Sequence, residues 1–265
     1  MAADPAGTSP ATLKLAVAGK GGSGKTVLAT LLARALSERG SMVLAVDLDA
    51  NPGLAVSLGV TPHDLALPDS AVEARSSATY GWGLASHLTA AEAVRRFAFR
   101  AADKVAYLGF GNMASLETPL HRYLTAVRQV AAGFDEPGWV VLLDLAGGTT
   151  NPFEGYAEVA SRALITVEAT PTSIMTGRRV QDILTTWSVP SEIVLMNART
   201  DADVEMVASW APPIAVVPFD PEIRRLTRQG PLSGLAADSP ALTAVRALAG
   251  TLLETPAGPP ALGGR

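Results

Sequence analysis

The sequence predicts an α/β protein with a doubly wound, mostly parallel sheet between two layers of helices. Seven short runs of apolar, often β-branched residues recur along the 265-residue chain. Their apolarity is continuous rather than alternating, which is typical of strands covered on both faces. Helical patterns separate many of these runs, and the resulting βαβα order favours parallel strands joined by helical crossovers.

The elements follow in order along the chain. We expect strands at residues 13–18, 42–47, 104–109, 139–144, 163–168, 192–197 and 213–218. We expect helices at residues 25–39, 89–100, 119–132, 172–187 and 239–253. Residues 1–12 and 254–265 are rich in Pro, Gly and Ala, so we expect disordered ends around a single domain spanning residues 13–253.

Composition narrows the classes of function. The net charge of −4 argues against coating of nucleic acid over the whole surface, although it leaves a local basic patch open. Absence of cysteine removes disulfides, thiolate metal sites and a cysteine nucleophile. The N-terminus lacks a signal pattern, and no run approaches the roughly 18 apolar residues of a membrane span, so we expect a soluble, cytoplasmic protein.

The stretch GKGGSGKT, Gly19–Thr26, satisfies the phosphate-loop pattern G-x-x-x-x-G-K-[ST] and lies between a predicted strand and a predicted helix. Its glycines allow backbone N–H groups to surround phosphate oxygens, and the helix N-terminus favours the same negative charge. Lys25 is expected to reach the β- and γ-phosphates, and the Thr26 hydroxyl to ligate Mg²⁺. The predicted nucleotide-binding residues here are Gly19, Gly21, Gly22, Ser23, Gly24, Lys25, Thr26 and Val27.

Lys20 has no role in an ordinary phosphate loop. With it, GKGGSGKT resembles the deviant Walker A motif, K-G-G-x-G-K-[ST], of the MinD/ParA/nitrogenase iron protein class of P-loop ATPases. In that class the early lysine reaches across a dimer interface to the partner's nucleotide. The resemblance implies that Lys20 acts in this way, that the chain forms a homodimer on binding ATP, and that its cofactors are ATP and Mg²⁺. The alternative is a solvated loop lysine.

Two further segments are similar to the switch regions of that class. VDLDANP follows the second strand, and the resemblance makes Asp49 the residue that orients or activates the attacking water near the Mg²⁺ shell. For Asp47 two roles stay open, a contribution to the Mg²⁺ shell or an interaction at the dimer interface. VVLLDLAGG resembles the Walker B and switch II segment. The resemblance implies that Asp144 holds Mg²⁺ partly through water, and that Gly147 and Gly148 lie in a loop that can move when the γ-phosphate leaves. Turn or capping chemistry is the alternative for these aspartates.

Two later segments resemble the base-binding parts of the class. IVLMNART places Asn197 at a strand end, as in the asparagine that contacts adenine, although Ala198 replaces the basic residue that commonly follows. VVPFDPEIRRL resembles the loop whose backbone frames adenine, at Pro218, Phe219 and Asp220. The preference for ATP over GTP rests on this resemblance alone.

Across residues 13–253 the pattern is most similar to the carbon monoxide dehydrogenase maturation ATPases, which help to insert nickel. Those proteins hold metal with a C-x-C pair, and the corresponding segment here, Gly109–Pro119, has no cysteine. The three histidines, His63, His87 and His121, do not form a metal-spaced cluster. Nickel carriage through thiolates is therefore excluded, and the role of the segment stays open.

Other branches of the class have sequence features that can be compared with this chain. MinD ends in an amphipathic membrane helix, whereas the tail here is rich in Pro and Gly, so we expect no membrane partner. ParA-type ATPases bind DNA through basic residues, which Arg178, Arg179, Arg224, Arg225 and Arg228 offer here. The acidic net charge favours solvated helix faces over a DNA-binding patch.

We therefore predict an ATPase in which Lys20, Lys25 and Asp49 are catalytic and Thr26, Asp49 and Asp144 hold Mg²⁺. The expected function is a molecular switch that forms a nucleotide-sandwich homodimer and hydrolyses ATP slowly to mature or assemble an unidentified client protein. One alternative is a partition ATPase with ATP-dependent DNA binding. Another is a nucleotide-sensing regulator with little turnover, or a small-molecule kinase-like member of the superfamily.

Overall fold

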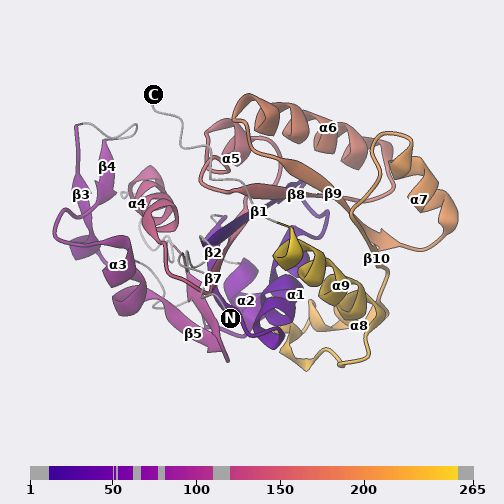
Figure 1. The fold of residues 1–265 in the computed structure, drawn as a ribbon, viewed down its shortest axis with the longest axis horizontal. Coiled ribbons are helices and arrows are strands. Elements are labelled where there is room, and N and C mark those ends of the chain that lie inside the picture. The colour runs from indigo at the N-terminus through magenta and orange to yellow at the C-terminus, as the bar shows by residue number, and fades with distance from the viewer. Residues whose placement is uncertain are drawn as a thin grey trace, which may run out of the picture.

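The structure is a computed structural model that describes residues 12–49, 51, 53–61, 67–76, 81–109 and 120–255. Its main feature is an eight-stranded sheet (Figure 1). In chain order the strands are β1 (Leu13–Gly19), β2 (Met42–Leu48), β5 (Phe99–Ala102), β6 (Val105–Leu108), β7 (Trp139–Leu145), β8 (Arg162–Val167), β9 (Ser191–Ala198) and β10 (Ala215–Pro218). In space their order is β10-β9-β8-β1-β7-β2-β6-β5, and every pairing is parallel except that of β5 with β6. The predicted fold class is confirmed.

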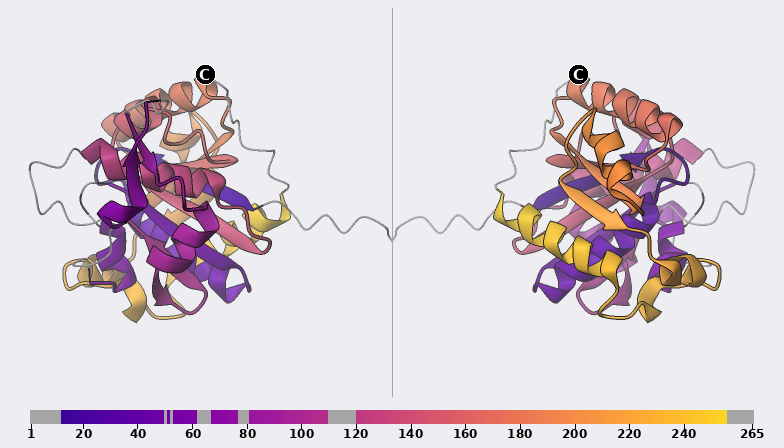
Figure 2. Two further views of the ribbon diagram at one scale, coloured as in Figure 1. Left: turned by 90° about the vertical axis from the view of Figure 1, so that its left-hand side faces the viewer. Right: turned by 90° about the vertical axis from the view of Figure 1, so that its right-hand side faces the viewer.

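Helices cover both faces of the sheet. In chain order they are α1 (Lys25–Glu38), α2 (Gly53–Leu58), α3 (Ala90–Phe97), α4 (Leu120–Gly133), α5 (Thr150–Phe153), α6 (Pro171–Thr186), α7 (Asp201–Ala208), α8 (Pro221–Leu226) and α9 (Pro240–Glu254), with 3₁₀ turns at Asp69–Ala71 and Leu232–Gly234. Figures 1 and 2 show α6 and α9 on opposite sides of the sheet. The arrangement has three layers, as the continuous apolarity of the strands predicts.

Each face of the sheet has its own hydrophobic core, and the central strand β1 contributes to both. Leu15 and Val17 pack into the core shared with α1 and α9, whereas Ala16 and Ala18 pack into the core shared with α4 and α6. All four side chains are fully buried. Alternate residues of a strand point to opposite faces, so a buried central strand needs apolar residues at every position.

The register of the central strands brings their carboxyl ends to one edge of the sheet. In β1, Val17 lies opposite Asp144 of β7, and Asp144 in turn lies opposite Asp47 of β2. On the other side of β1, Gly19 lies opposite Thr166 of β8. The polar residues at these strand ends therefore meet around the point where β1 runs into α1, which is where ligands bind in open α/β sheets.

All seven predicted strands form, but one predicted helix is too long. The expected helix 89–100 ends at Phe97, and Phe99 begins β5, which folds back antiparallel beside β6. The reversal occurs at Asp103–Lys104, where Lys104 has a φ of 56°. The short strand β5 has little apolar signal because its residues are mostly exposed at the sheet edge.

Several smaller elements were not predicted. β3 (Val72–Ala74) and β4 (Trp82–Leu84) form a separate antiparallel pair. The helices α2, α5, α7 and α8, of four to eight residues, were also missed. The helix expected at 119–132 spans Leu120–Gly133, and Pro119 lies outside the described residues.

Of the disordered ends predicted at residues 1–12 and 254–265, residues 1–11 and 256–265 fall outside the described residues, so this part stays a prediction, as does the single domain. The C-terminal end was predicted to begin too early, because Glu254 still belongs to α9. At the inner boundary of the expected N-terminal end, Thr12 is buried and its hydroxyl donates to the Glu136 carbonyl at 2.9 Å. Within the described part of the chain, none of the helices has the length and apolarity needed to cross a membrane.

Candidate functional site

The loop between β1 and α1, residues 20–24, is held in shape by its own carbonyl and hydroxyl groups. The Lys20 carbonyl accepts hydrogen bonds from the Ser23 amide at 3.1 Å, the Ser23 hydroxyl at 2.8 Å and the Lys25 ammonium at 3.2 Å. Gly24 caps α1 in the left-handed region, with a φ of 92° that favours glycine. The loop thus presents the N-terminus of a 14-residue helix at the carboxyl edge of the sheet.

Ser23 anchors this loop to the neighbouring strand. Its side chain is 1% exposed and its hydroxyl lies 2.7 Å from the Thr166 hydroxyl of β8. The Thr166 hydroxyl also donates to the Ala18 carbonyl at 3.2 Å. Thr166 was not predicted as part of the site, because nothing in a single sequence shows that β8 lies beside β1.

Thr26 and Asp144 form the part of the site that fits a divalent cation. The Thr26 hydroxyl donates to Asp144 Oδ2 at 2.7 Å. Asp144 Oδ1 is buried and has no hydrogen-bond partner among the described residues. A buried carboxylate oxygen without a donor is costly, and carboxylate and hydroxyl oxygens are the ligands that Mg²⁺ prefers. The two residues therefore fit the predicted metal.

The charges around Asp144 interact with one another. Burial raises its pKa to about 6, while the hydrogen bond from Thr26 and the charge of Lys25 lower it and Asp49 raises it. Burial also lowers the pKa of the Lys25 ammonium, against the opposing influence of Asp144 and Asp49. Lys25, Asp49 and Asp144 are thus brought together at one place, as the sequence predicts.

Lys20 differs from Lys25 in its surroundings. Lys25 is 7% exposed, whereas the Lys20 side chain is exposed. Among the described residues no hydrogen bond or ion pair engages the Lys20 ammonium, and only its backbone carbonyl takes part in the loop. The side chain is therefore free to contact a molecule outside its own chain.

Asp47 and Asp49 have different positions at the end of β2. Asp49 is half-buried, and its Oδ1 accepts from the Asn51 amide at 2.9 Å. Asp47 is 1% exposed; its Oδ1 accepts from the Asp49 amide at 3.0 Å and its Oδ2 from the Leu54 amide at 3.2 Å. Burial, followed by the charge of Asp144, holds the pKa of Asp47 well above its usual value. Asp47 therefore holds both ends of the segment that carries Asp49.

The loop after β7 lies directly against the phosphate loop. The Gly148 amide donates to the Gly19 carbonyl at 2.9 Å. A Cβ on Gly147 would lie 2.9 Å from Gly21 Cα and 3.3 Å from Lys25 Nζ. At the start of α5, the Asn151 amide group donates to the Leu48 carbonyl at 3.0 Å, which ties this loop to the end of β2.

Asn197, at the end of β9, is close to the phosphate loop through its neighbour Met196. A Cβ on Gly24 would lie 3.1 Å from Met196 Cε, so β9 ends beside the first turn of α1. Asn197 has a φ of 58°, and its side-chain amide donates to Glu168 Oε1 at 2.7 Å. Val27 lies in that first turn and is half-buried.

The segment Pro218–Asp220 lies next to Asn197 through a backbone contact. The Phe219 amide donates to the Ala198 carbonyl at 2.9 Å, and the Arg199 guanidinium lies 3.6 Å from the centre of the Phe219 ring. The Asp220 carboxylate is already engaged, because it accepts from the Glu222 amide at 2.9 Å and from the Ser239 hydroxyl at 2.6 Å. Glu168 and Arg199 were missed from the sequence, although Arg199 follows two residues after Asn197.

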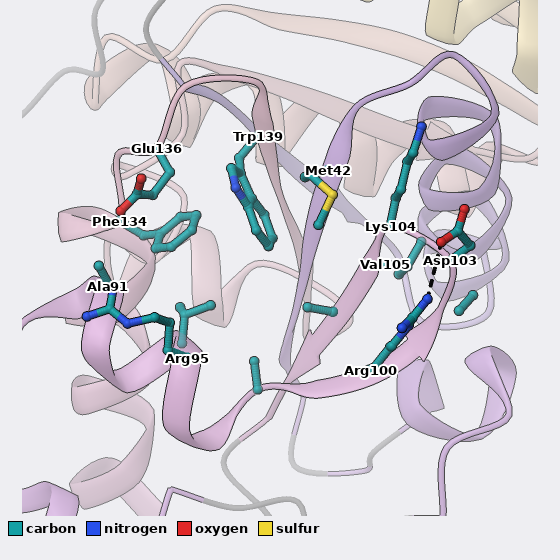
Figure 3. Close-up of a pocket in the computed structure, with 14 residues that line it drawn as sticks. Met42, Ala91, Arg95, Arg100, Asp103, Lys104, Val105, Phe134, Glu136 and Trp139 are labelled. Atoms are coloured by element: carbon teal, nitrogen blue, oxygen red, sulfur yellow. Dashed lines mark hydrogen bonds and ion pairs between the residues drawn. The ribbon is translucent and has the colours of Figure 1, made fainter.

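A separate hollow of about 560 Å³ lies at the opposite edge of the sheet, at the amino ends of β2, β6 and β7. Figure 3 shows Met42 and Trp139 in its centre, with the Arg100–Asp103 ion pair on one side. Four alanines, Ala91, Ala98, Ala102 and Ala106, also line it. None of the predicted site residues does, so the hollow is distinct from the phosphate-loop site.

Comparison with known families also indicates a nucleotide-binding protein. The sequence model described as CobQ/CobB/MinD/ParA nucleotide binding domain matches residues 14–230, so the chain belongs to this family. It is a MinD/ParA-type protein of the P-loop ATPases, as its phosphate loop predicts.

Two relatives are similar over most of their length. The carbon monoxide dehydrogenase accessory protein CooC of Rhodospirillum rubrum is 26% identical over 234 residues, which are 82% of this chain and 88% of CooC. An uncharacterized ATP-binding protein of Methanocaldococcus jannaschii is 25% identical over 229 residues, 80% of this chain and 87% of that protein. The predicted similarity to the carbon monoxide dehydrogenase branch is confirmed.

Solved structures confirm the fold. The septum site-determining protein MinD of Pyrococcus horikoshii, in complex with Mg-ADP, superposes with a TM-score of 0.67 at 20% identity, covering 92% of this chain and 96% of that one.

Proposed function

We propose that the protein is an ATP-dependent molecular switch, which forms a nucleotide-sandwich homodimer and hydrolyses ATP slowly to mature or assemble a client protein. The observation that carries this proposal is the meeting of Lys25, Thr26 and Asp144 beside the phosphate loop, where the buried Asp144 Oδ1 has no hydrogen-bond partner in the described part of the chain. Membership of the CobQ/CobB/MinD/ParA family supports it.

In this proposal the phosphates of ATP lie in the loop Gly19–Thr26, against backbone N–H groups and the positive end of α1. Lys25 is the cation of the same protomer at the β- and γ-phosphates. Thr26 and Asp144 would hold Mg²⁺, with a contribution from Asp49 partly through water, and the ion would supply positive charge against the phosphates. The Mg-ADP in the related MinD structure supports this choice of ligand.

Asp49 is the residue proposed to orient the attacking water. It lies at the carboxyl end of β2 within electrostatic reach of Lys25 and Asp144, and its Oδ1 is held by the Asn51 amide. Phosphoryl transfer depends chiefly on positioning and on stabilisation of charge, so a carboxylate held beside the phosphates is suited to this role.

The Lys20 side chain is proposed to contact the nucleotide that is bound by the partner protomer. Its exposed ammonium has no partner among the described residues, while its carbonyl closes the phosphate loop of its own chain. A lysine arranged in this way leaves its own site intact when the side chain extends outward. The second cation offsets the repulsion between two triphosphates that face each other in the dimer.

The base is proposed to bind between Asn197 and the backbone at Pro218–Asp220. Asn197 is held by Glu168, and Phe219 is held by the Ala198 carbonyl and the Arg199 guanidinium. Since both carboxylate oxygens of Asp220 are engaged within the chain, Asp220 contributes through its backbone.

The client protein is proposed from the similarity to CooC, at 26% identity. This chain has no cysteine, so a client is not served through thiolate-held metal. Most of the segment Gly109–Pro119 lies outside the described residues. We place this activity in the cytoplasm.

DNA binding is a weaker candidate because some of the basic residues already have partners. Arg225 forms an ion pair with Glu222 at 2.5 Å, and Arg178 lies 5.8 Å from the centre of the Trp210 ring. ATP-dependent, salt-sensitive retention on DNA would favour the partition alternative. A stable ATP dimer without turnover would favour the regulator.

Size-exclusion chromatography with ATP and Mg²⁺, together with ATPase rates, tests the proposal. Lys20→Ala should bind ATP but neither dimerise nor hydrolyse it, since only the cation supplied by the partner is missing. Asp49→Ala should accumulate as an ATP-bound dimer. Lys104→Ala, which changes a lysine in the distant β5–β6 turn, is the control and should behave as the parent. Normal dimerisation and turnover in Lys20→Ala would contradict the proposal.

A further inference from the structure

Glu168 lies at the carboxyl edge of the sheet, beside the residue proposed to contact the base. It follows β8 directly, and the last pair in the ladder of β8 and β9 is Val167 with Leu195. Asn197 comes two residues after Leu195, and its side-chain amide donates to Glu168 Oε1 at 2.7 Å. The contact therefore joins the ends of two paired strands.

The backbone around each of the two partners is held by further hydrogen bonds. The Glu168 amide donates at 3.0 Å to the hydroxyl of Ser173, which is buried in the first turn of α6. Asn197 has a φ of 58°, which asparagine adopts more readily than most residues. The carbonyl of the next residue, Ala198, accepts from the Phe219 amide at 2.9 Å. The two side chains thus approach each other from fixed positions.

The Glu168 carboxylate determines which way round the Asn197 amide lies. A carboxylate has only acceptor oxygens, so it pairs with the NH₂ group of the amide and not with Oδ1. In the opposite orientation two oxygens would face each other and the hydrogen bond would be lost. Asn197 is exposed, and among the described residues no hydrogen bond engages its Oδ1. This oxygen is therefore available as an acceptor for a bound molecule.

An acceptor with a fixed orientation distinguishes the two common purine bases. Adenine has an amino donor at position 6, whereas guanine has an oxygen acceptor there. Asn197 Oδ1 can accept from the amino group of adenine, but it would face the guanine oxygen with no proton between them. Asn197 could pair with that oxygen only by turning its amide round, which would break the hydrogen bond with Glu168.

We propose that Glu168 is a positioning residue that makes the base site selective for adenine over guanine, by fixing the orientation of the Asn197 amide. This inference rests on the proposed contact between Asn197 and the base, and it extends that contact to a residue that does not itself touch the nucleotide. A glutamate that served only to stabilise the end of β8 would leave the choice of base unchanged.

The first test measures the binding of ADP, GDP and inosine diphosphate by isothermal titration calorimetry with Mg²⁺. Diphosphates avoid hydrolysis and the dimerisation proposed for ATP. The parent should bind ADP at least about tenfold more tightly than GDP. In Glu168→Gln this ratio should fall roughly tenfold, mainly through tighter binding of GDP, because a glutamine amide can pair with Asn197 in either orientation. Inosine diphosphate has the guanine oxygen at position 6 but lacks the 2-amino group, so it should follow GDP in both proteins.

Glu205→Gln is the matched control for the loss of charge. Glu205 lies on α7 and is exposed, and its carboxylate forms no hydrogen bond or ion pair with another described residue. The ratio of the ADP and GDP affinities should therefore stay at its parental value in this variant. An unchanged ratio in Glu168→Gln would overturn the inference. So would an equal fall in the control, or a gain in GDP affinity that inosine diphosphate does not share.

A second test asks whether Glu168 acts through Asn197. Asn197→Ala should weaken ADP binding and bring the affinities for ADP and GDP together. When Glu168→Gln is added to Asn197→Ala, the ratio should stay within about twofold, because no amide is left to orient. A larger change of the ratio in the double variant would show that Glu168 contacts the base itself, and this would overturn the positioning role.

These outcomes also separate the inference from the proposed function. If the parent selects ADP and Glu168→Gln selects it equally well, the inference is wrong and the proposed switch is unaffected. If the parent binds no nucleotide, the proposed function is wrong and the inference is wrong with it. If the parent selects ADP but neither dimerises with ATP nor hydrolyses it, the proposed switch is wrong, while the measured ratios still decide the role of Glu168.

Discussion

Gly147 lies so close to the phosphate loop that a side chain in its place would displace the loop after β7 or the loop before α1. A Cβ at this position would lie 2.9 Å from Gly21 Cα and 3.1 Å from the Gly21 amide nitrogen, both backbone atoms that cannot rotate away. Since real Cβ atoms essentially never lie under 3.0 Å from another atom, as this one would from Gly21 Cα, one of the two loops has to shift to accept a side chain.

Gly147→Ala should therefore weaken ATP binding about tenfold or more, because the phosphate loop is displaced from its hydrogen-bonded shape. Isothermal titration calorimetry measures the change. Gly234→Ala is the control, since a Cβ there would meet only the end of Leu226 at an ordinary 3.6 Å. Unchanged affinity in Gly147→Ala would show that the two loops separate before the nucleotide binds.

Asp144 gives a pH dependence whose sign follows from its pKa. Burial raises that pKa from 3.8 to about 6. Between these values the folded protein keeps a proton that the unfolded chain has lost, so the contribution of Asp144 to stability falls as pH rises through this range. Asp144→Asn has no such titration.

The free energy of unfolding of the parent, relative to Asp144→Asn, should consequently fall by about 2 kcal/mol between pH 4 and pH 7. Urea unfolding of both proteins at each pH, without Mg²⁺ or nucleotide, measures this difference. A difference that stays constant with pH would show that Asp144 titrates alike in the folded and unfolded states.

At the scale of elements, the helix caps hold the loops that carry predicted base-binding residues. Thr200 begins the eight-residue helix α7 with a capping box, in which its hydroxyl accepts from the Asp203 amide at 3.3 Å. The Asp203 carboxylate accepts from the amides of Arg199 and Thr200. The cap thus holds the chain immediately after Asn197.

Thr200→Ala should lower the free energy of unfolding by about 1 kcal/mol, the usual cost of losing a threonine N-cap. Thr185→Ala is the control, because Thr185 lies on the exposed surface inside α6 and its hydroxyl donates only to the Gln181 carbonyl. Chemical denaturation measures both variants. Equal effects of the two substitutions would show that the cap contributes nothing specific to α7.

The elements differ in how far the sequence determines them. The long buried strands and α1 were predicted because their apolar runs or phosphate-loop motif are continuous in sequence. The short strand β5 was missed because its four residues are mostly exposed. The pair β3–β4 was missed because three-residue strands carry too few positions for a period to be recognised.

The residues of the candidate site also differ in how far the sequence predicts them. Gly19–Thr26 is one contiguous motif, so its residues could be predicted together, and Asp144 was predicted by resemblance at a strand end. The contacts of Ser23 with Thr166 and of Asn197 with Glu168 depend on the register between strands far apart in the chain. A single sequence does not give that register, so these partners appear only in the structure.

At the scale of the whole molecule, the phosphate loop follows the central strand, which contributes to both hydrophobic cores. The start of the loop is therefore held from both faces of the sheet, while the Lys20 side chain is exposed. A loop held at its start, with an exposed lysine, suits a site that is completed by a second protomer. This arrangement allows a test in which two defective chains repair each other.

Lys20→Ala should bind ATP but give no cation to its partner, whereas Lys25→Ala should bind ATP poorly but still supply Lys20. Mixed dimers then have one complete site, so the mixture should recover roughly a quarter of the parental ATPase rate per protomer if the chains pair at random. Each variant alone should be nearly inactive. In the control, Lys20→Ala is mixed with a chain that carries both substitutions, and no activity should return because neither chain supplies the lysine. If the first mixture also stays inactive at concentrations where the parent hydrolyses ATP, Lys20 does not act across an interface.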